Sequence, residues 1–170
     1  MVRAVFLDRD GVLNEAPMRD GVPGSPRTRE EVRLFPDAVD SVRKIRDAGM
    51  LAIVVTNQPD VARGLMSLEF HNRIQCELAW KCKLDAAYSC CHDYDCECRK
   101  PNPGLVIKAA NRYGIDLSAS WMVGDQERDI EAGIRAGCRT VFIDRGYALP
   151  KPTMVCVADL ASAVKWILQH

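Results

Sequence analysis

The chain has 170 residues, of which 48% are hydrophobic and 27% are charged, and its 23 basic residues are balanced by 23 acidic ones. This composition is typical of one ordinary globular domain, which we expect to span residues 1–170, and the balanced charge argues against a nucleic-acid partner. No apolar run approaches the roughly 20 residues needed to cross a bilayer, and the first apolar stretch meets an acid too early for a signal peptide. We therefore expect a cytoplasmic monomer without membrane contact.

Strands and helices are predicted to alternate along the whole chain. Continuous apolar or β-branched runs predict strands, and amphipathic stretches between them predict helices. The expected strands cover residues 4–7, 51–55, 84–88, 120–123 and 139–143. The expected helices begin near Pro36, Ser67, Asn102, Ile130 and Asp159. This alternation predicts the α/β class, with a Rossmann-like, doubly wound parallel sheet that carries helices on both faces.

Two sets of side chains are expected to be buried. In the helix after Pro36, the spacing of Val39, Val42 and Ile45 predicts the stripe that packs on the sheet. The four cysteines outside residues 90–98 are expected to pack as small hydrophobic side chains, and these are Cys76, Cys82, Cys138 and Cys156.

Two acids follow the first predicted strand directly. Asp8 and Asp10 are two positions apart, so in an extended chain their side chains lean the same way, past the carboxyl end of the strand. Ligands bind at this edge in open parallel sheets. Two carboxylates this close repel each other unless a cation lies between them or one is protonated. The pair therefore suits a divalent metal such as Mg²⁺, or a nucleophile with a neighbouring acid/base; the plain alternative is a solvated acidic turn.

Polar residues also end two other predicted strands. Thr56 and Asn57 follow the second strand, and Asp125 follows the fourth. Arg99 and Lys100 lie in a loop that can reach the same edge of the sheet. Together these residues would supply acids for a metal, a hydroxyl and an amide, and two cations for an anion. The unusually long loop at residues 15–33 leaves the chain beside the two acids, and we expect it to form part of a pocket wall.

A metal site is predicted in residues 90–98. Three thiols and one imidazole match a closed, structural Cys₃His zinc site, and the ligands are Cys90, His92, Cys96 and Cys98. Only three residues separate His92 from Cys96, so Cys91 is an alternative ligand to Cys90. Disulfides are disfavoured in a cytoplasmic protein. The zinc is expected to stiffen the loop that presents Arg99 and Lys100.

These motifs resemble those of the haloacid dehalogenase-like phosphatases, in the order and spacing of that family and over nearly the whole chain. The matching segments are Asp8-Arg9-Asp10-Gly11-Val12-Leu13-Asn14, Val55-Thr56-Asn57-Gln58, Lys100-Pro101 and Gly124-Asp125-x-x-x-Asp129. The Cys/His cluster before Arg99-Lys100-Pro101 is similar to the zinc-bearing branch, which includes heptose-bisphosphate and histidinol-phosphate phosphatases. The segment Thr56-Asn57-Gln58-x-x-x-Ala62-Arg63-Gly64 is closer to the heptose enzymes.

The resemblance implies a mechanism. Asp8 would attack phosphorus and form an aspartyl-phosphate, and Asp10 would protonate the departing alkoxide and then activate water. Mg²⁺ would be held by Asp8, the backbone carbonyl of Asp10, and Asp125. Thr56 and Lys100 would stabilise the transferred phosphoryl group.

The resemblance also implies a small-molecule substrate, a sugar bisphosphate. The residues expected to bind it are Asn57, Gln58, Arg63 and Arg99, with Arg99 on the phosphate that is not cleaved. Two positions depart from relatives: Gln126 stands where several carry lysine, and Asp60 stands where many carry glycine. Asp129 is expected only to cap a helix.

The chain leaves no room for a cap domain after the first motif, so the resemblance implies an open site. We expect this site to be closed only by the loop at residues 15–33 and by the zinc loop. The alternatives are a histidinol-phosphate phosphatase, a polynucleotide phosphatase and a non-catalytic binding protein on the same fold.

Overall fold

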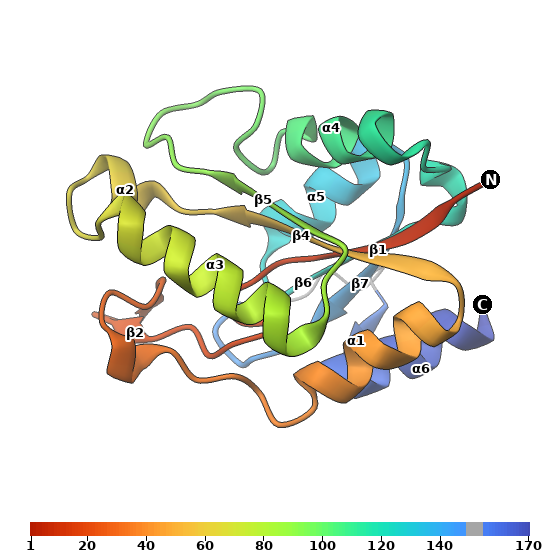
Figure 1. Cartoon of the computed structure of the whole chain (residues 1–170), viewed down its shortest axis with the longest axis horizontal. Coiled ribbons are helices and arrows are strands. Elements are labelled where there is room, and N and C mark those ends of the chain that lie inside the picture. Colours follow the sequence, from red (N-terminus) through yellow and green to blue (C-terminus); the bar gives the residue numbers. More distant parts are fainter. Residues whose placement is uncertain (149–154) are drawn as a thin grey trace.

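The central element is a six-stranded parallel sheet (Figure 1). The computed structural model describes residues 1–148 and 155–170. The strands run in the order β5-β4-β1-β6-β7-β8. Their bounds are β1 Arg3–Leu7, β4 Met50–Asn57, β5 Ala86–Cys90, β6 Trp121–Gly124, β7 Arg139–Ile143 and β8 Cys156–Val157. β1 lies in the interior of the sheet, because its apolar residues 4–7 are buried whichever face they point to.

Helices cover both faces of this sheet, as predicted for a doubly wound α/β fold. One face carries α1 (Ala38–Asp47), α3 (Leu68–Cys82) and α6 (Leu160–Gln169), and the other carries α4 (Gly104–Tyr113) and α5 (Glu127–Ala136). Successive side chains of a strand point to opposite faces. Accordingly, Val5 and Leu7 belong to the core beneath α1 and α6, whereas Ala4 and Phe6 belong to the core beneath α4.

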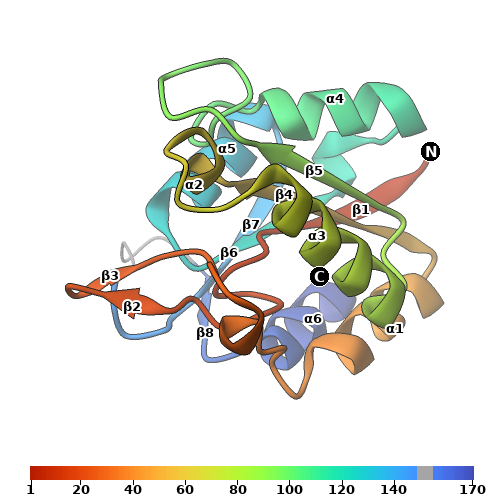
Figure 2. The same ribbon diagram turned by 60° about the vertical axis from the view of Figure 1, so that its left-hand side comes forward.

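Three excursions gather at one edge of the sheet (Figure 2). The loop at residues 15–33 contains a small antiparallel hairpin, β2 (Met18–Arg19) with β3 (Val22–Pro23), and a 3₁₀ turn at Arg29–Glu31. The short helix α2 (Pro59–Ala62) follows β4, and the Cys/His loop follows β5. Within residues 1–148 and 155–170 no cap domain is present, and none of the helices described there is long and apolar enough to cross a membrane.

Some details of burial differ from the prediction. Val39 is 45% exposed, because α1 turns Ala38, Ser41, Val42 and Ile45 toward the core instead. Cys82 and Cys138 are buried as predicted, but Cys76 and Cys156 are exposed. Cys76 lies off the buried stripe of α3, which consists of His71, Ile74, Leu78 and Cys82 at helical spacing.

Several boundaries also moved. α5 begins at Glu127, before the predicted Ile130, because Gln126 and Asp129 form a capping box that starts the helix earlier. Pro103, not Asn102, precedes α4 as its N-cap. β5 begins at Ala86, two residues late, since Lys83 ends α3 in the left-handed conformation. The two-residue strand β8 was not predicted; it is too short to carry a periodic pattern.

Candidate active site and metal centre

The ends of three adjacent strands meet at the predicted site. β1, β4 and β6 are neighbours in the sheet, so Asp8, Thr56 and Asp125 emerge at the same edge. A cavity of about 330 Å³ opens there, and the predicted residues that line it are Asp8, Asp10, Thr56, Asn57, Arg63 and Arg99. The loop at residues 15–33 contributes Arg19, Ser25 and Arg27 to the wall, as expected. The remaining predicted residues, Gln58, Lys100 and Asp125, are buried behind the lining.

Lys100 joins two buried carboxylates behind the cavity. Its Nζ lies 2.8 Å from Asp8 Oδ1 and 2.7 Å from Asp129 Oδ1, and it donates to the Val55 carbonyl at 2.8 Å. Burial opposes the ammonium charge, but Asp129 and Asp8 outweigh it and raise the pKa of Lys100. Asp129 thus does more than cap α5: one of its oxygens accepts from the Gln126 amide at 3.0 Å, while the other meets Lys100.

Asp10 is held by hydrogen bonds from four side chains. Arg9 donates to both of its oxygens, through Nε at 3.0 Å and Nη2 at 2.9 Å. Asn14 Nδ2 donates at 2.8 Å, Ser25 Oγ at 2.7 Å and Gln58 Nε2 at 2.8 Å. Burial raises the pKa of Asp10, yet the charge and hydrogen bonds of Arg9, with those of Asn14 and Gln58, lower it overall. The carboxylate is therefore both oriented and favoured in its ionised form.

Arg9 is itself fully buried and is supported from behind. Its Nη1 lies 3.4 Å from Gln75 Oε1 and 3.4 Å from His71 Nδ1, both on α3. His71 Nε2 lies 3.0 Å from Ser89 Oγ on β5. Burial, and then the charge of Arg9, lower the pKa of His71 to about 4, so this ring is neutral near pH 7.

The acidic group beside Asp8 fits a divalent cation. Oxygens of Asp8, Asp125 and Asp129 lie within 4.8 Å of one another. Asp125 Oδ1 is buried without a hydrogen-bond partner among the residues described, and its Oδ2 accepts from the Tyr147 hydroxyl. Burial, then Asp129 and Asp8, raise the pKa of Asp125 well above its usual range. Gly11 leaves this space open, since a Cβ there would lie 1.9 Å from Asp125 Oδ2. Mg²⁺ prefers carboxylate oxygens as ligands. The three acids have too little positive charge around them to balance their own, so they could hold such an ion.

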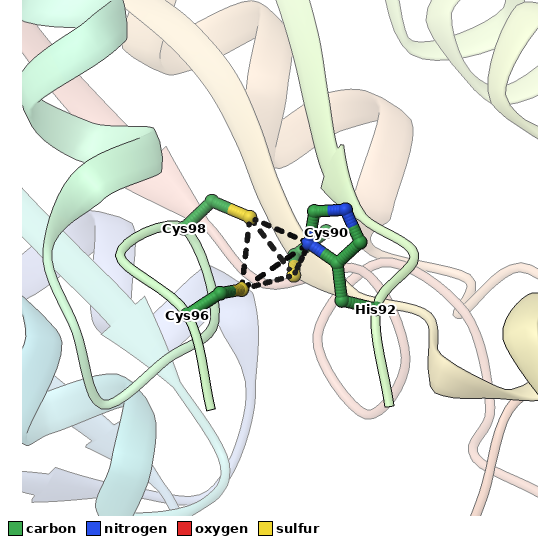
Figure 3. Close-up of side chains that lie close together, drawn as sticks. All are labelled: Cys90, His92, Cys96 and Cys98. Atoms are coloured by element: carbon green, nitrogen blue, oxygen red, sulfur yellow. Dashed lines mark hydrogen bonds between the residues drawn. The ribbon is translucent and has the colours of Figure 1, made fainter. Parts of the chain in front are cut away.

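The Cys/His cluster is tetrahedral in outline (Figure 3). The six distances among its three Sγ atoms and His92 Nδ1 run from 3.0 to 3.7 Å, and the residues are Cys90, His92, Cys96 and Cys98. A tetrahedral zinc with Zn–S bonds of about 2.3 Å would separate its ligands by about 3.5 to 3.8 Å, so the four atoms lie somewhat closer together than around the ion but in the arrangement that could hold it. All the cysteines are free thiols, and Cys91 lies outside the cluster.

The Cys/His cluster lies next to the cavity, because Arg99 and Lys100 directly follow its last ligand, Cys98. Asn57 forms a pair of hydrogen bonds with the Lys100 backbone, accepting from its amide at 3.0 Å and donating to its carbonyl at 2.9 Å. Arg99 Nη1 donates to the His92 carbonyl at 2.8 Å. The loop that carries the cluster is thereby fixed to the end of β4, and it presents Arg99 to the cavity while burying Lys100 beneath it.

Sequence reasoning missed several residues of this site. The sequence indicates Arg9 only as part of a motif and Ser25 only as part of the loop at residues 15–33, and it does not predict Tyr147. Asp60, noted as a departure from relatives, is buried and accepts from Arg27 Nε at 2.8 Å. Position in the motif was a usable signal for Arg9, whereas nothing near Tyr147 marks it as a partner of an acid 22 residues away.

Comparisons with known proteins agree with this geometry. A family model described as "HAD-hyrolase-like" matches residues 97–162. A D-glycero-D-manno-heptose-1,7-bisphosphate 7-phosphatase of Thermosynechococcus vestitus is 34% identical, over 98% of this chain and 96% of that protein. A D-glycero-beta-D-manno-heptose-1,7-bisphosphate 7-phosphatase of Yersinia pestis is 31% identical over 96% of each. The crystal structure of the D,D-heptose 1,7-bisphosphate phosphatase from B. bronchiseptica, complexed with magnesium and phosphate, superposes with a TM-score of 0.82 at 31% identity, covering 99% of both chains.

The fold and the site define a haloacid dehalogenase-like hydrolase, an enzyme class that acts on phosphate esters. Within that class, identity over almost the full length is decisive. The chain belongs to the family of the D-glycero-D-manno-heptose-1,7-bisphosphate 7-phosphatases.

Proposed function

We propose that this protein removes the 7-phosphate of D-glycero-D-manno-heptose 1,7-bisphosphate, on the route to activated heptose. The observation that carries the proposal is the placement of Asp8, which lines an arginine-rich cavity with Lys100 behind it and the clamped Asp10 beside it. The names of the full-length relatives support the substrate.

Asp8 would be the nucleophile. One of its oxygens attacks phosphorus, so that an O–P bond forms to Asp8 while the bond from phosphorus to the sugar oxygen breaks. Lys100 and Thr56 stabilise the charge on the transferred oxygens. Thr56 Oγ1 already accepts from Gln58 Nε2 at 3.0 Å, which leaves its own proton free to be donated to a phosphoryl oxygen. Lys100 is shared with Asp129, so it stays in place when the charge on Asp8 is consumed.

Asp10 would move the protons. Asp10 is ionised in the free protein, so it must first bind a proton from solvent, which the negative charge of a bound phosphate favours. It then gives this proton to the alkoxide, a poor leaving group, as the bond to phosphorus breaks, and the ionised carboxylate takes a proton from the water that hydrolyses the aspartyl-phosphate. Its hydrogen bonds from Arg9, Asn14, Ser25 and Gln58 fix its direction for both steps. Gln58 therefore acts on substrate through Asp10 and Thr56, because its side chain is fully buried.

Two metals are proposed with separate duties. Asp8, the Asp10 backbone carbonyl and Asp125 would hold Mg²⁺, which supplies positive charge against the phosphate when bound. Cys90, His92, Cys96 and Cys98 would hold a structural zinc that fixes the loop presenting Arg99. Arg99, Arg63 and Asn57 remain the proposed substrate contacts at the cavity wall.

The test is phosphate release with Mg²⁺ from a panel of both anomers of the heptose bisphosphate, histidinol phosphate and a 3′-phosphorylated oligonucleotide. A large preference in kcat/KM for one heptose anomer is expected, and it also assigns the anomer. A preference for histidinol phosphate or the oligonucleotide would overturn the substrate. Release from none of them would favour a binding protein on the same fold.

A further inference from the structure

Five arginines line the cavity, and most of them are already engaged. The set is Arg19, Arg27, Arg63, Arg99 and Arg128. Arg19 meets Glu31 at 2.5 Å, Arg27 meets Asp60 at 2.8 Å, and Arg63 meets Asp93 at 2.5 Å. An anion that approached these three guanidiniums would have to compete with a carboxylate for each of them.

Arg99 and Arg128 differ from the other three. Arg99 donates to the His92 carbonyl, which is a neutral acceptor. The side chain of Arg128, the second residue of α5, has no hydrogen bond or ion pair with any residue in the described ranges 1–148 and 155–170. Ion pairing is available on the same helix, since Arg135 meets Glu131 at 2.5 Å. The cavity therefore contains two guanidiniums that form no ion pair with a carboxylate in the described part of the chain, although Asp93, which is paired with Arg63, lies near enough for the charge of Arg99 to lower its pKa.

Arg128 lies where the catalytic cavity adjoins a second hollow. Together with Pro23 and Gln126 it lines both the catalytic cavity and a shallower hollow beside Tyr147. It thus lies on the first turn of α5, beside the β2–β3 hairpin, in the wall of the same cavity that Asp8 lines. A substrate whose reacting phosphate is at Asp8 therefore occupies a cavity in which Arg128 is part of the wall.

We propose that Arg128, together with Arg99, binds the phosphate of the substrate that is not transferred, and so makes the enzyme selective for bisphosphates over monophosphates. This inference rests on the proposed function. A phosphate ester carries up to about two negative charges, which these two guanidiniums without ion pairs match. Guanidinium groups bind phosphate through paired hydrogen bonds, and at Arg128 no existing ion pair must break first.

The experiment compares kcat/KM for the heptose 1,7-bisphosphate and for the same sugar carrying only the 7-phosphate, in the wild type and in Arg128→Gln. Hydrogen bonds to charged groups typically contribute enough to predict a fall of about tenfold or more in the ratio of the two values, mainly through a higher KM for the bisphosphate. Arg128→Lys should recover part of the ratio, because it keeps the charge but loses the paired geometry.

Arg135→Gln is the matched control, an exposed arginine on the same helix that does not line the cavity. It should keep the wild-type ratio, which separates damage to α5 from loss of the contact. A wild-type ratio in Arg128→Gln would overturn the role of Arg128 while leaving the proposed function standing. A ratio near one in the wild type itself would overturn the bisphosphate substrate, and this role with it.

Discussion

The surroundings of Asp8 and Asp10 are opposite in character, although the two residues are only two positions apart. Around Asp8, three buried carboxylates share one ammonium, that of Lys100. Burial raises the pKa of Asp8, and burial with the neighbouring acids raises that of Asp125. Around Asp10, a single carboxylate receives hydrogen bonds from four side chains, and its pKa is lowered despite its burial.

This difference separates two kinds of catalytic group. The carboxylates around Asp8 outnumber the positive charges, so they are balanced only when a cation is bound. The ionised form of Asp8 is therefore disfavoured, which is compatible with a nucleophile that must react. The Asp10 side is complete without any ligand, so the protein alone fixes its direction. Substitutions on the two sides should therefore change activity and stability in different combinations.

The largest effect is expected for Asp8→Asn. Removing the nucleophile should lower kcat by a factor of about 10⁴ or more, because no other group in the cavity replaces the covalent step. Stability should stay the same or rise by about 1 kcal/mol, since the change removes a buried charge that its surroundings disfavour. Phosphate release with Mg²⁺ measures the activity, and urea unfolding without added Mg²⁺ measures the stability. A substantial loss of stability would contradict the description of the Asp8 side as short of positive charge.

Arg9→Gln should give the reverse combination. The loss of activity should be smaller, about 10²-fold in kcat, because Asp10 remains but is no longer directed. The loss of stability should be larger, about 3–5 kcal/mol, because Asp10 would be left as a buried charge without its ion-pair partner. Arg9→Lys keeps the charge and should retain part of both. If Asp8→Asn and Arg9→Gln destabilised the protein equally, the surroundings of Asp8 and Asp10 would not differ in the way described.

The sequence predicted Asp8, Thr56, Lys100 and Asp125 on the Asp8 side because these residues depend on strand ends and a motif, but it did not predict the contact of Asp129 with Lys100 or that of Tyr147 with Asp125. β1, β4 and β6 are adjacent and parallel, so any polar residues that follow them must meet. The Cys/His cluster could also be predicted from the sequence, because its ligands are close together in the chain and the metal chemistry of thiols is distinctive.

The Asp10 side was far less predictable. Its support comes from His71 and Gln75, more than 60 residues away on α3, which the sequence predicts only as a helix beginning near Ser67. Nothing local distinguishes a buried, neutral histidine from an exposed one on such a helix. Burial of Arg9 was likewise unpredictable, because an arginine between two acids is more often solvated than enclosed.

Removal of a zinc ligand should affect the Asp8 side through Lys100. Cys96→Ser should abolish zinc binding and lower the stability by several kcal/mol, because metal binding and folding are coupled in such sites. Activity should fall less than in Arg9→Gln, since Asn57 still holds the Lys100 backbone. Metal analysis and thermal unfolding are the measurements.

Cys91→Ser is the control for this change, because Cys91 is adjacent to the cluster but outside it. It should retain one zinc per chain. Loss of zinc in Cys91→Ser, with zinc kept in Cys90→Ser, would exchange the two ligands. Wild-type protein purified without zinc would remove the metal from the proposal.

The smallest effect is expected at His71, which lies behind the Arg9–Asp10 pair, and it is an effect on folding stability that appears only at acidic pH. The pKa of His71 is about 4 in the folded protein and about 6.5 in the unfolded chain, so between these values the unfolded state binds a proton that the folded state does not. Folding stability should therefore fall as the pH drops from about 6.5 to about 4, by up to about 3 kcal/mol, and level off below. His71→Gln removes this dependence, so its free energy of unfolding should decrease less than that of the wild type between pH 7 and pH 4. His170→Gln removes an exposed histidine that does not contact Arg9 and serves as the comparison. If the free energy of unfolding changed with pH in the same way in His71→Gln and in the wild type, His71 would be protonated as readily in the folded protein as in the unfolded chain. Arg9 would then not exclude a second positive charge beside it.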